Sequence, residues 1–262
     1  MPATPKTHFQ KKQVRKVIES PNALVKLFVP IEHLKGAPVV MGFPNIGVTP
    51  VVTCSYLVND LDLDLIGCID IENMSSTAVI SKTGQPCHAV RIFGDSRIII
   101  VNSELKIPEE VLYDLSRAIV AFCQEAKIET LWCVEGIPID KQDFERDEMQ
   151  FISSSEELSN KLIAKGHSVL RDAVIAGVTG AVLNEISTFG GGVEVCCVLA
   201  PTSSYYPDVW ASVMVIRLLD SLYESWSTDT TKLEQSATSM ENKVKQLMSN
   251  TLRRSGNQTY YL

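Results

Sequence analysis

Residues 38–59 read PVVMGFPNIGVTPVVTCSYLVN, and this stretch predicts a strand, a tight turn and a helix in succession. The apolar run 38–43 favours a strand. The sequence Pro44-Asn45-Ile46-Gly47 is typical of a turn, because glycine adopts positive φ at little cost. Thr49 and Pro50 supply an N-cap and a first helical position, after which apolar residues crowd one broad face. A strand that leads directly into a helix is the repeating unit of α/β proteins.

The same alternation continues outward from this stretch, from about residue 25 to residue 225. Strands are expected at 25–29, 38–43, 65–71, 88–93, 98–101, 130–134, 149–153, 174–177 and 193–200, with 149–153 at a sheet edge. Helices are expected at 49–60, 108–123, 155–164, 178–185 and 208–223. The pair Gly94-Asp95 predicts a hairpin turn, which would add antiparallel pairing. We therefore predict one α/β domain with a mixed sheet flanked by helices.

Composition and charge narrow the function classes. The chain has 262 residues, of which 45% are hydrophobic and 21% charged, as in globular proteins. A formal net charge of −7 argues against a broad surface for nucleic acid phosphates, so no nucleic acid partner is expected. No apolar run approaches the ~18 residues of a membrane span, so no membrane partner is expected either. The Lys/Gln-rich residues 1–22 are expected to form a basic flexible leader.

The seven cysteines predict a reducing compartment. They stand at positions 54, 68, 87, 123, 133, 196 and 197, within apolar stretches and without a Cys-x-x-Cys motif. Cys196 and Cys197 are neighbours, so they would point to opposite faces of a strand and could not hold one metal ion together. We expect buried reduced thiols, no metal site and a cytoplasmic protein, or a nuclear one in a eukaryote.

Polar residues near the ends of the expected strands and helices form a candidate cleft, made of Asn45, Glu135, Asn184, Tyr206 and Asp208. Open α/β sheets place ligand sites at the carboxyl ends of their strands, so an acid-base site could be assembled there. The competing interpretation is that Glu135 sits in a loop and that Asp208 caps its helix. No P-loop, dinucleotide turn or Ser-His-Asp signature is readable, and no cofactor is expected.

The chain changes character after Trp226. A narrow apolar seam at helical spacing comprises Leu233, Ala237, Met240, Val244 and Leu247. This seam predicts an amphipathic helix within 227–252 that lies on the body of the protein or on a partner subunit. Together with the long apolar helix at 208–223, it favours a homo-oligomer.

The last residues of the chain are expected to be a flexible tail, 253–262, after the leader, the α/β domain at 23–226 and the helix at 227–252. The tail begins with a polar tether that shows no periodicity. It ends in Tyr260, Tyr261 and Leu262, which lie outside any element that could bury them. A hydrophobic end on a polar tether is typical of a segment that binds a partner.

Three segments, PVVMGFPNIG at 38–47, IAGVTGAVL at 175–183 and APTSSYYPDVWA at 200–211, occur in an order and spacing that resemble one family. It is the proteasome assembly chaperone 2 family, including its archaeal homologues. The resemblance spans about residues 23–252. The motif positions that we expect to be structural are Gly42, Pro44, Gly47, Gly177, Gly180 and Pro201.

This resemblance implies a fold similar to the purine nucleoside phosphorylase and hydrolase sandwich, without an established catalytic role. It also implies binding to the α subunits of the proteasome core particle through a C-terminal hydrophobic-Tyr-x tail. Tyr260, Tyr261 and Leu262 match the three positions of that tail. Archaeal members form homo-oligomers and eukaryotic members heterodimers, so the second expected partner is another copy of this chain or a related chaperone subunit.

Three functions remain open on the sequence. The first is a non-enzymatic chaperone or activator that binds the proteasome, and the C-terminal tail favours it. The second is a nucleosidase-like enzyme of small molecules that uses the cleft, which a bound nucleobase, ribose or phosphate would favour. The third is an oligomeric scaffold with a disordered tail.

Overall fold

The structure is a computed structural model that describes residues 12–44, 48–74, 77–81, 84–138, 148–189, 192–203 and 209–239. The strands are β1 (Lys16–Ser20), β2 (Ala23–Leu27), β3 (Val39–Gly42), β4 (Leu65–Ile71), β5 (Val79–Ile80), β6 (Pro86–Cys87), β7 (Val90–Gly94), β8 (Ile99–Asn102), β9 (Thr130–Pro138), β10 (Gln150–Ser153), β11 (Ser168–Val169) and β12 (Glu194–Thr202). The α-helices are α1 (Thr49–Asp60), α2 (Leu112–Glu125), α3 (Glu156–Ala164), α4 (Gly177–Phe189) and α5 (Val209–Asp220). The described residues also include the 3-10 helices η1 (Ile31–Leu34) and η3 (Glu109–Val111).

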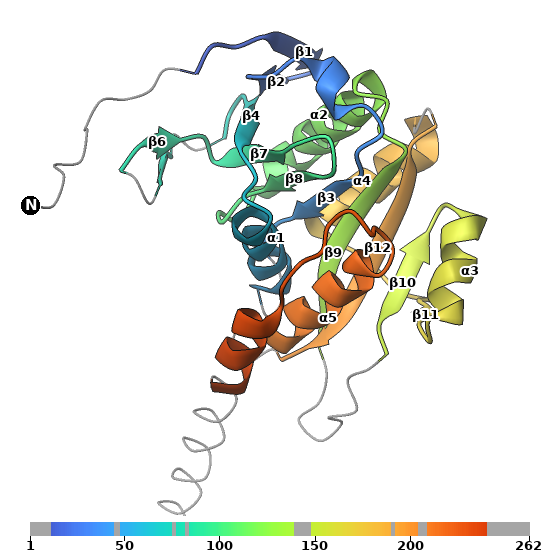
Figure 1. Cartoon of the computed structure of the whole chain (residues 1–262). Helices are drawn as coiled ribbons and strands as arrows, with labels where there is room; N and C mark the ends of the chain where they lie inside the picture. The colour runs from blue at the N-terminus through green and yellow to red at the C-terminus, as the bar shows by residue number, and fades with distance from the viewer. Residues whose placement is uncertain are drawn as a thin grey trace, which may run out of the picture.

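A ten-stranded mixed sheet runs through the protein in the order β1-β2-β4-β7-β8-β3-β9-β12-β10-β11 (Figure 1), and β5 and β6 form a separate two-stranded sheet. Its centre is parallel, because β8, β3, β9 and β12 all run in the same direction. Antiparallel pairs extend it through β7, β4, β2 and β1 on one side and through β10 on the other. This arrangement confirms the predicted mixed sheet and the hairpin turn between β7 and β8.

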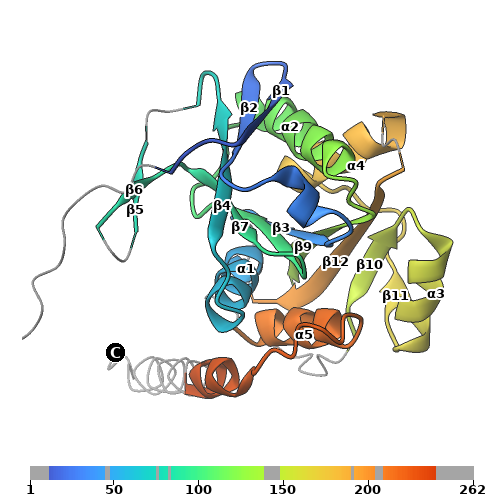
Figure 2. The same ribbon diagram turned by 45° about the horizontal axis from the view of Figure 1, so that its top comes forward.

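Helices cover both faces of this sheet. α2 and α4 pack on one face, and α1 and α5 pack on the other (Figure 2). Each helical layer encloses its own apolar cluster, with Phe122 buried in the first and Trp132 in the second. Cys197 belongs to the first cluster and Cys196 to the second, which confirms that the two cysteines point to opposite faces.

The predicted flexible leader, residues 1–22, is wrong for its last part, because residues 16–20 form strand β1. Pro21 and Asn22 make a tight turn, with Asn22 at a φ of 57°, and β1 then pairs antiparallel with β2. Ile18 is only 8% exposed and belongs to the cluster beneath α2. Burial of this side chain and the hairpin hydrogen bonds stabilise a strand where the charge pattern alone indicated a solvated segment.

Two strand predictions near the centre of the chain are wrong. The strand beginning at Thr130 does not end at residue 134 but continues to Pro138, because β12 runs beside it and pairs residue for residue up to Thr202. Residues 174–177 form no strand and pair with no strand of the sheet. Val174 is 93% exposed, and Gly177, at a φ of 73°, begins α4.

Two local predictions also change. Thr49 is the first residue of α1 rather than its N-cap, which is Val48 in a left-handed conformation. The buried Thr49 hydroxyl instead lies 3.2 Å from the Thr202 hydroxyl of β12. The segment 149–153 is not an edge strand, because β10 pairs with β12 on one side and with β11 on the other.

Candidate functional site

A cleft opens at the carboxyl ends of the parallel strands, where β3 gives way to Phe43 and Pro44 and where β9 ends. Its volume is about 810 Å³. The lining residues are Phe43, Pro44, Lys106, Ile107, Glu109, Leu112, Glu135, Gly136, Ile137, Pro138, Leu170, Ala173, Val174, Ile175, Ala176, Gly177, Val178 and Leu199. Open α/β sheets bind ligands at the carboxyl ends of their parallel strands, because neighbouring connections leave these ends toward opposite faces of the sheet.

Glu135 is the buried acidic group in the wall of this cleft. It lies within β9 opposite Leu199 of β12, and only 7% of its surface is exposed. The Thr179 hydroxyl, on the first turn of α4, donates a hydrogen bond to its Oε1 atom. Burial disfavours the charged carboxylate more than this hydrogen bond stabilises it, which raises the pKa of Glu135 to about 7. Glu135 is therefore able to exchange a proton near neutral pH.

The structure brings together only part of the cleft that the sequence predicts. Glu135 lies in the cleft, although in a strand and not in a loop. Asn184 does not line the cleft, because it stands on the exposed side of α4, where its carbonyl accepts a hydrogen bond from the Ser187 hydroxyl. The remaining predicted cleft residues, Asn45, Tyr206 and Asp208, lie outside the described residues.

Thr179, Lys106 and the segment 170–176 are part of the site but were missed by the sequence reasoning. Thr179 lies inside the segment IAGVTGAVL that carries part of the family resemblance, so that motif was a usable signal. Lys106 and Glu109 are exposed at the rim of the cleft. No local pattern links residues 106 and 179 to Glu135, because the fold alone brings them together.

The family-motif glycines Gly42 and Gly180 occur where backbones approach closely. A Cβ atom on Gly42 would lie 2.6 Å from Cys54 Sγ and would also collide with the Pro50 carbonyl. A Cβ atom on Gly180 would collide with the Ile175 carbonyl. Gly42 thus lets α1 cross the end of β3, and Gly180 lets the segment before α4 fold back on the helix.

The other motif positions differ in what the structure describes. Pro44 and Gly177 line the cleft, and Pro201 lies in β12 opposite Ile137 of β9. Gly47 lies outside the described residues, as do the predicted proteasome-binding residues Tyr260, Tyr261 and Leu262.

The described start of the C-terminal helix packs on the rest of the protein. Residues 231–239 are helical, four positions later than the predicted start at 227, and the seam residues Leu233 and Ala237 are only 7% and 1% exposed. Just before this helix, the backbone of Asp229 makes two contacts with α1. Its carbonyl accepts a hydrogen bond from Tyr56 Oη at 2.6 Å, and its N–H donates to an Asp60 carboxylate oxygen at 3.0 Å. Further seam residues, Met240, Val244 and Leu247, lie outside the described residues.

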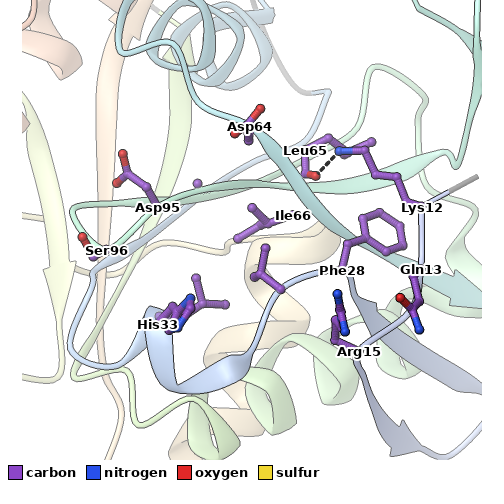
Figure 3. Close-up of a pocket in the computed structure, with 13 residues that line it drawn as sticks. Lys12, Gln13, Arg15, Phe28, His33, Asp64, Leu65, Ile66, Asp95 and Ser96 are labelled. Carbon is purple, nitrogen blue, oxygen red and sulfur yellow. Dashed lines mark hydrogen bonds between the residues drawn. The ribbon is translucent and has the colours of Figure 1, made fainter. Parts of the chain in front are cut away.

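A second pocket of about 720 Å³ is lined by the segment before β1 and by residues at the ends of β2, β4 and β7 (Figure 3). Lys12 donates a hydrogen bond to the Leu65 carbonyl at 2.6 Å and lies 5.7 Å from the centre of the Phe28 ring. Figure 3 shows Arg15 near Phe28, with Asp95 across the pocket. Asp95 already pairs with Arg97, at 2.5 Å. Charges of both signs on separate walls do not define one ligand class, so the cleft around Glu135 is the better candidate.

The described residues contain no candidate metal site and no disulfide bond. These residues contain no group of three or more His, Cys, Asp or Glu side chains that could hold a metal ion. All seven cysteines are free, and six of them are buried. In the part of the chain that the structure describes, no helix has the length and apolar character needed to cross a membrane.

Fold and site together define the class: an α/β protein with one large mixed sheet between two helical layers and a cleft at the carboxyl ends of its parallel strands. The chain belongs to the PAC2 family, whose family model matches residues 39–248. A comparison of the sequence with curated proteins finds no match.

Solved structures of similar fold come from archaea and bacteria. The chain is 25% identical to PbaA of Pyrococcus furiosus, an archaeal homologue of proteasome-assembly chaperone, with a TM-score of 0.75 over 91% of this chain and 99% of PbaA. PbaB of the same organism, an archaeal proteasome activator, is 15% identical, with a TM-score of 0.73 over 87% of this chain and 99% of PbaB. A Mycobacterium tuberculosis proteasome-assembly chaperone homologue is 15% identical, with a TM-score of 0.61 over 80% of this chain and 94% of its own.

Proposed function

We propose that this chain is a proteasome-binding assembly chaperone or activator that docks on the α ring of the core particle through Tyr260, Tyr261 and Leu262. The observation that carries the proposal is the PAC2 family match over residues 39–248. Relatives named as a proteasome-assembly chaperone homologue and as a proteasome activator support the general role. The tail sequence supports the particular mode of docking.

The physical basis of docking is the capture of a chain end by a pocket. Aromatic side chains bury a large area at a small cost in rotamer entropy, and a terminal carboxylate pairs with a cation at the end of the pocket. In this proposal the polar segment before Tyr260 serves as the tether of the tail. The anchored start of that helix, around Leu233 and Ala237, supports a fixed point from which the tail extends.

Tyr261→Ala tests this proposal directly. Loss of the central aromatic anchor should weaken binding to purified core particle by about 2 kcal/mol per engaged tail, a hot-spot-sized loss. One extra residue after Leu262 should weaken it comparably, because the carboxylate moves away from its cation while both rings remain. Biolayer interferometry on immobilised core particle measures both effects.

Gln258→Ala is the matched control, since it changes the tether and leaves the three terminal residues intact. It should bind like the unaltered protein. If Tyr261→Ala and the extended chain also bind like the unaltered protein, the tail plays no part, and any proteasome contact comes from the folded body.

Self-association is part of the same proposal. One short tail binds weakly. Several tails on an oligomer that faces a ring bind with higher overall affinity, because the first tail to bind raises the effective concentration of the others. Leu233 and Ala237 are covered within one chain, so this half of the seam no longer argues for a partner subunit. Met240, Val244 and Leu247 are the seam residues that would bind another copy or a related chaperone subunit.

The alternative of a nucleosidase-like enzyme has one observation in its favour, the buried Glu135 with its pKa near neutrality. Acid-base catalysis needs a second group in the cleft, and the other ionisable side chains among the described lining residues, Lys106 and Glu109, are exposed at the rim. The likeness to the phosphorylase and hydrolase sandwich remains a prediction from the family resemblance. The alternative therefore ranks second.

A further inference from the structure

The free edge of strand β1 is suited to pair with the same strand of a second copy. β1 is the last strand on its side of the ten-stranded sheet (Figure 1), and among the described residues it pairs with β2 alone. We infer that two chains join antiparallel along β1, so that their sheets become continuous across a two-fold axis. This contact is separate from the C-terminal seam, and it does not depend on binding to the proteasome.

The backbone of β1 turns two residues toward the free edge. A two-residue turn joins β1 to β2, with Ser20 paired to Ala23 at its ends. The residues that flank such a turn exchange hydrogen bonds, and bonded and non-bonded pairs then alternate along the hairpin. In β1, every second residue counted back from Ser20 therefore bonds to β2. The N–H and C=O groups of Val17 and Glu19 point away from β2, where water or another strand satisfies them.

The side chains beside this edge are apolar and exposed on one face of the sheet. Val17 is 43% exposed, and Leu24, on the same face of β2, is 37% exposed. Both residues lie outside the two apolar clusters of the core. On the other face of β1, Ile18 is buried beneath α2. A second chain would cover Val17 and would set its own α2 layer beside the first, which removes apolar surface from water.

The charges on either side of Val17 are complementary to themselves. Arg15 and Glu19 flank it two positions away, both exposed, and neither side chain has an ion pair or hydrogen bond with a described residue. With the two-fold axis at Val17, the two valines face each other and exchange two backbone hydrogen bonds. Each Glu19 then faces the partner's Arg15. Opposite charges that face each other across paired strands stabilise the pair.

Neighbouring registers lose this match. An axis at Glu19 would set two carboxylates against each other, and an axis at Lys16 would set two ammonium groups against each other. An axis at Ile18 would place Val17 against the partner's Glu19 and leave Arg15 without an acid to face. The charges therefore favour the register centred on Val17 and disfavour its neighbours.

A disulfide across the axis tests the contact in the full chain. In a hydrogen-bonded antiparallel pair the Cα atoms lie about 5.5 Å apart, which suits a disulfide. Val17→Cys should give a covalent dimer with oxidised glutathione, seen as a band of twice the chain mass on a non-reducing gel. Leu24→Cys is the matched control, because it is similarly exposed on the same face but lies one strand away from the axis. It should cross-link no more than the unaltered protein, whose own cysteines set the background.

Exchange of the charges tests the register. Arg15→Glu should weaken self-association about tenfold, because like charges then face each other on both sides of the axis, and Glu19→Arg should do the same. The protein that carries both changes should associate like the unaltered protein, since the opposite charges are restored. Sedimentation equilibrium of the full chain compares the four proteins. Both side chains are exposed, so the melting temperature should stay the same in all of them.

Equal cross-linking of Val17→Cys and Leu24→Cys would overturn the inference, as would weak association of the protein with both charges exchanged. A full protein with the mass of one chain at every concentration would overturn it too. Tyr261→Ala should leave the cross-link through residue 17 intact, and Arg15→Glu should still bind the core particle. Failure of the tail proposal and failure of this inference can therefore be told apart.

Discussion

At the scale of single residues, burial of Glu135 makes the stability of the folded protein depend on pH. Its pKa rises from the ordinary 4.5 to about 7 because the wall of the cleft removes water from the carboxylate. Below pH 4.5 the group is neutral whether the chain is folded or not, and it has no effect on stability. Between pH 4.5 and about 7 the unfolded chain loses this proton while the folded protein keeps it, so stability falls across this range and levels off above it.

Glu135→Gln should therefore stabilise the protein at pH 8 by up to about 3 kcal/mol and change little at pH 4.5. The melting temperature of both proteins, measured across this range, checks the expectation. The melting temperature of the unaltered protein should fall relative to that of the variant as the pH rises. Parallel curves would show that Glu135 titrates normally.

Gly42→Ala tests the close approach of β3 and α1. The added methyl group would meet the Pro50 carbonyl, which is backbone and cannot turn away, so we expect a loss of about 1–3 kcal/mol. Gly166→Ala is the control. Its Cβ would have no neighbour within 4 Å, and only its positive φ of 88° would cost about 1 kcal/mol. Urea unfolding of both variants gives the comparison, and an equal loss in both would contradict the steric explanation.

At the scale of elements, the C-terminal helix is held on the body by burial more than by charge. Arg217 and Glu234 pair at 2.8 Å, but the arginine is more than half exposed, so the pair contributes little. Leu233 packs into the cluster beneath α1 and α5, where a leucine side chain contributes on the order of 2 kcal/mol. The contacts of Asp229 with Tyr56 and Asp60 fix the direction in which the chain enters the helix.

Leu233→Ala should loosen this helix and cost about 2–3 kcal/mol, and Ala237→Asp should detach it, because the new charge would be buried without a partner. Trypsin cleavage after Lys232 should become faster in both variants. Gln235→Ala, on the exposed side of the same helix, should cleave at the rate of the unaltered protein. Unchanged cleavage in Ala237→Asp would mean that the helix is not held by its apolar side.

At the scale of the whole molecule, the two helical layers complete two cores within one chain. The cluster beneath α2 and α4 and the cluster beneath α1 and α5 are both closed by the chain's own helices. Folding therefore needs no second subunit. Association, if it occurs, adds avidity for a ring of binding sites and does not complete the core.

Light scattering should give a mass above the 28.9 kDa of one chain at micromolar concentration. A chain that ends at residue 239 should keep the melting temperature of the full protein, because Leu233 and Ala237 remain in place. It should also shift toward the mass of one shortened chain if the rest of the seam joins the subunits. A mass of one chain for the full protein would contradict self-association.

The sequence by itself determined the features that depend on neighbouring residues. The strand and the helix expected within 38–59 agree with β3 and α1, and the helix after Ser155 begins where its hydroxyl caps it. The burial of most cysteines was readable from their apolar surroundings. Periodicity, capping and turn chemistry act over a few positions along the chain, so they can be read without the fold.

The tertiary structure alone decided the features that depend on pairing between distant residues. Residues 135–138 stay in β9 because β12 continues beside them, and residues 174–177 form no strand because they pair with no strand of the sheet. The same pairing puts Glu135 in the wall of a cleft, and α4 brings Thr179 to it from 44 positions away. Sheet hydrogen bonds and burial are made between segments far apart in the sequence, and they override local preference wherever the two disagree.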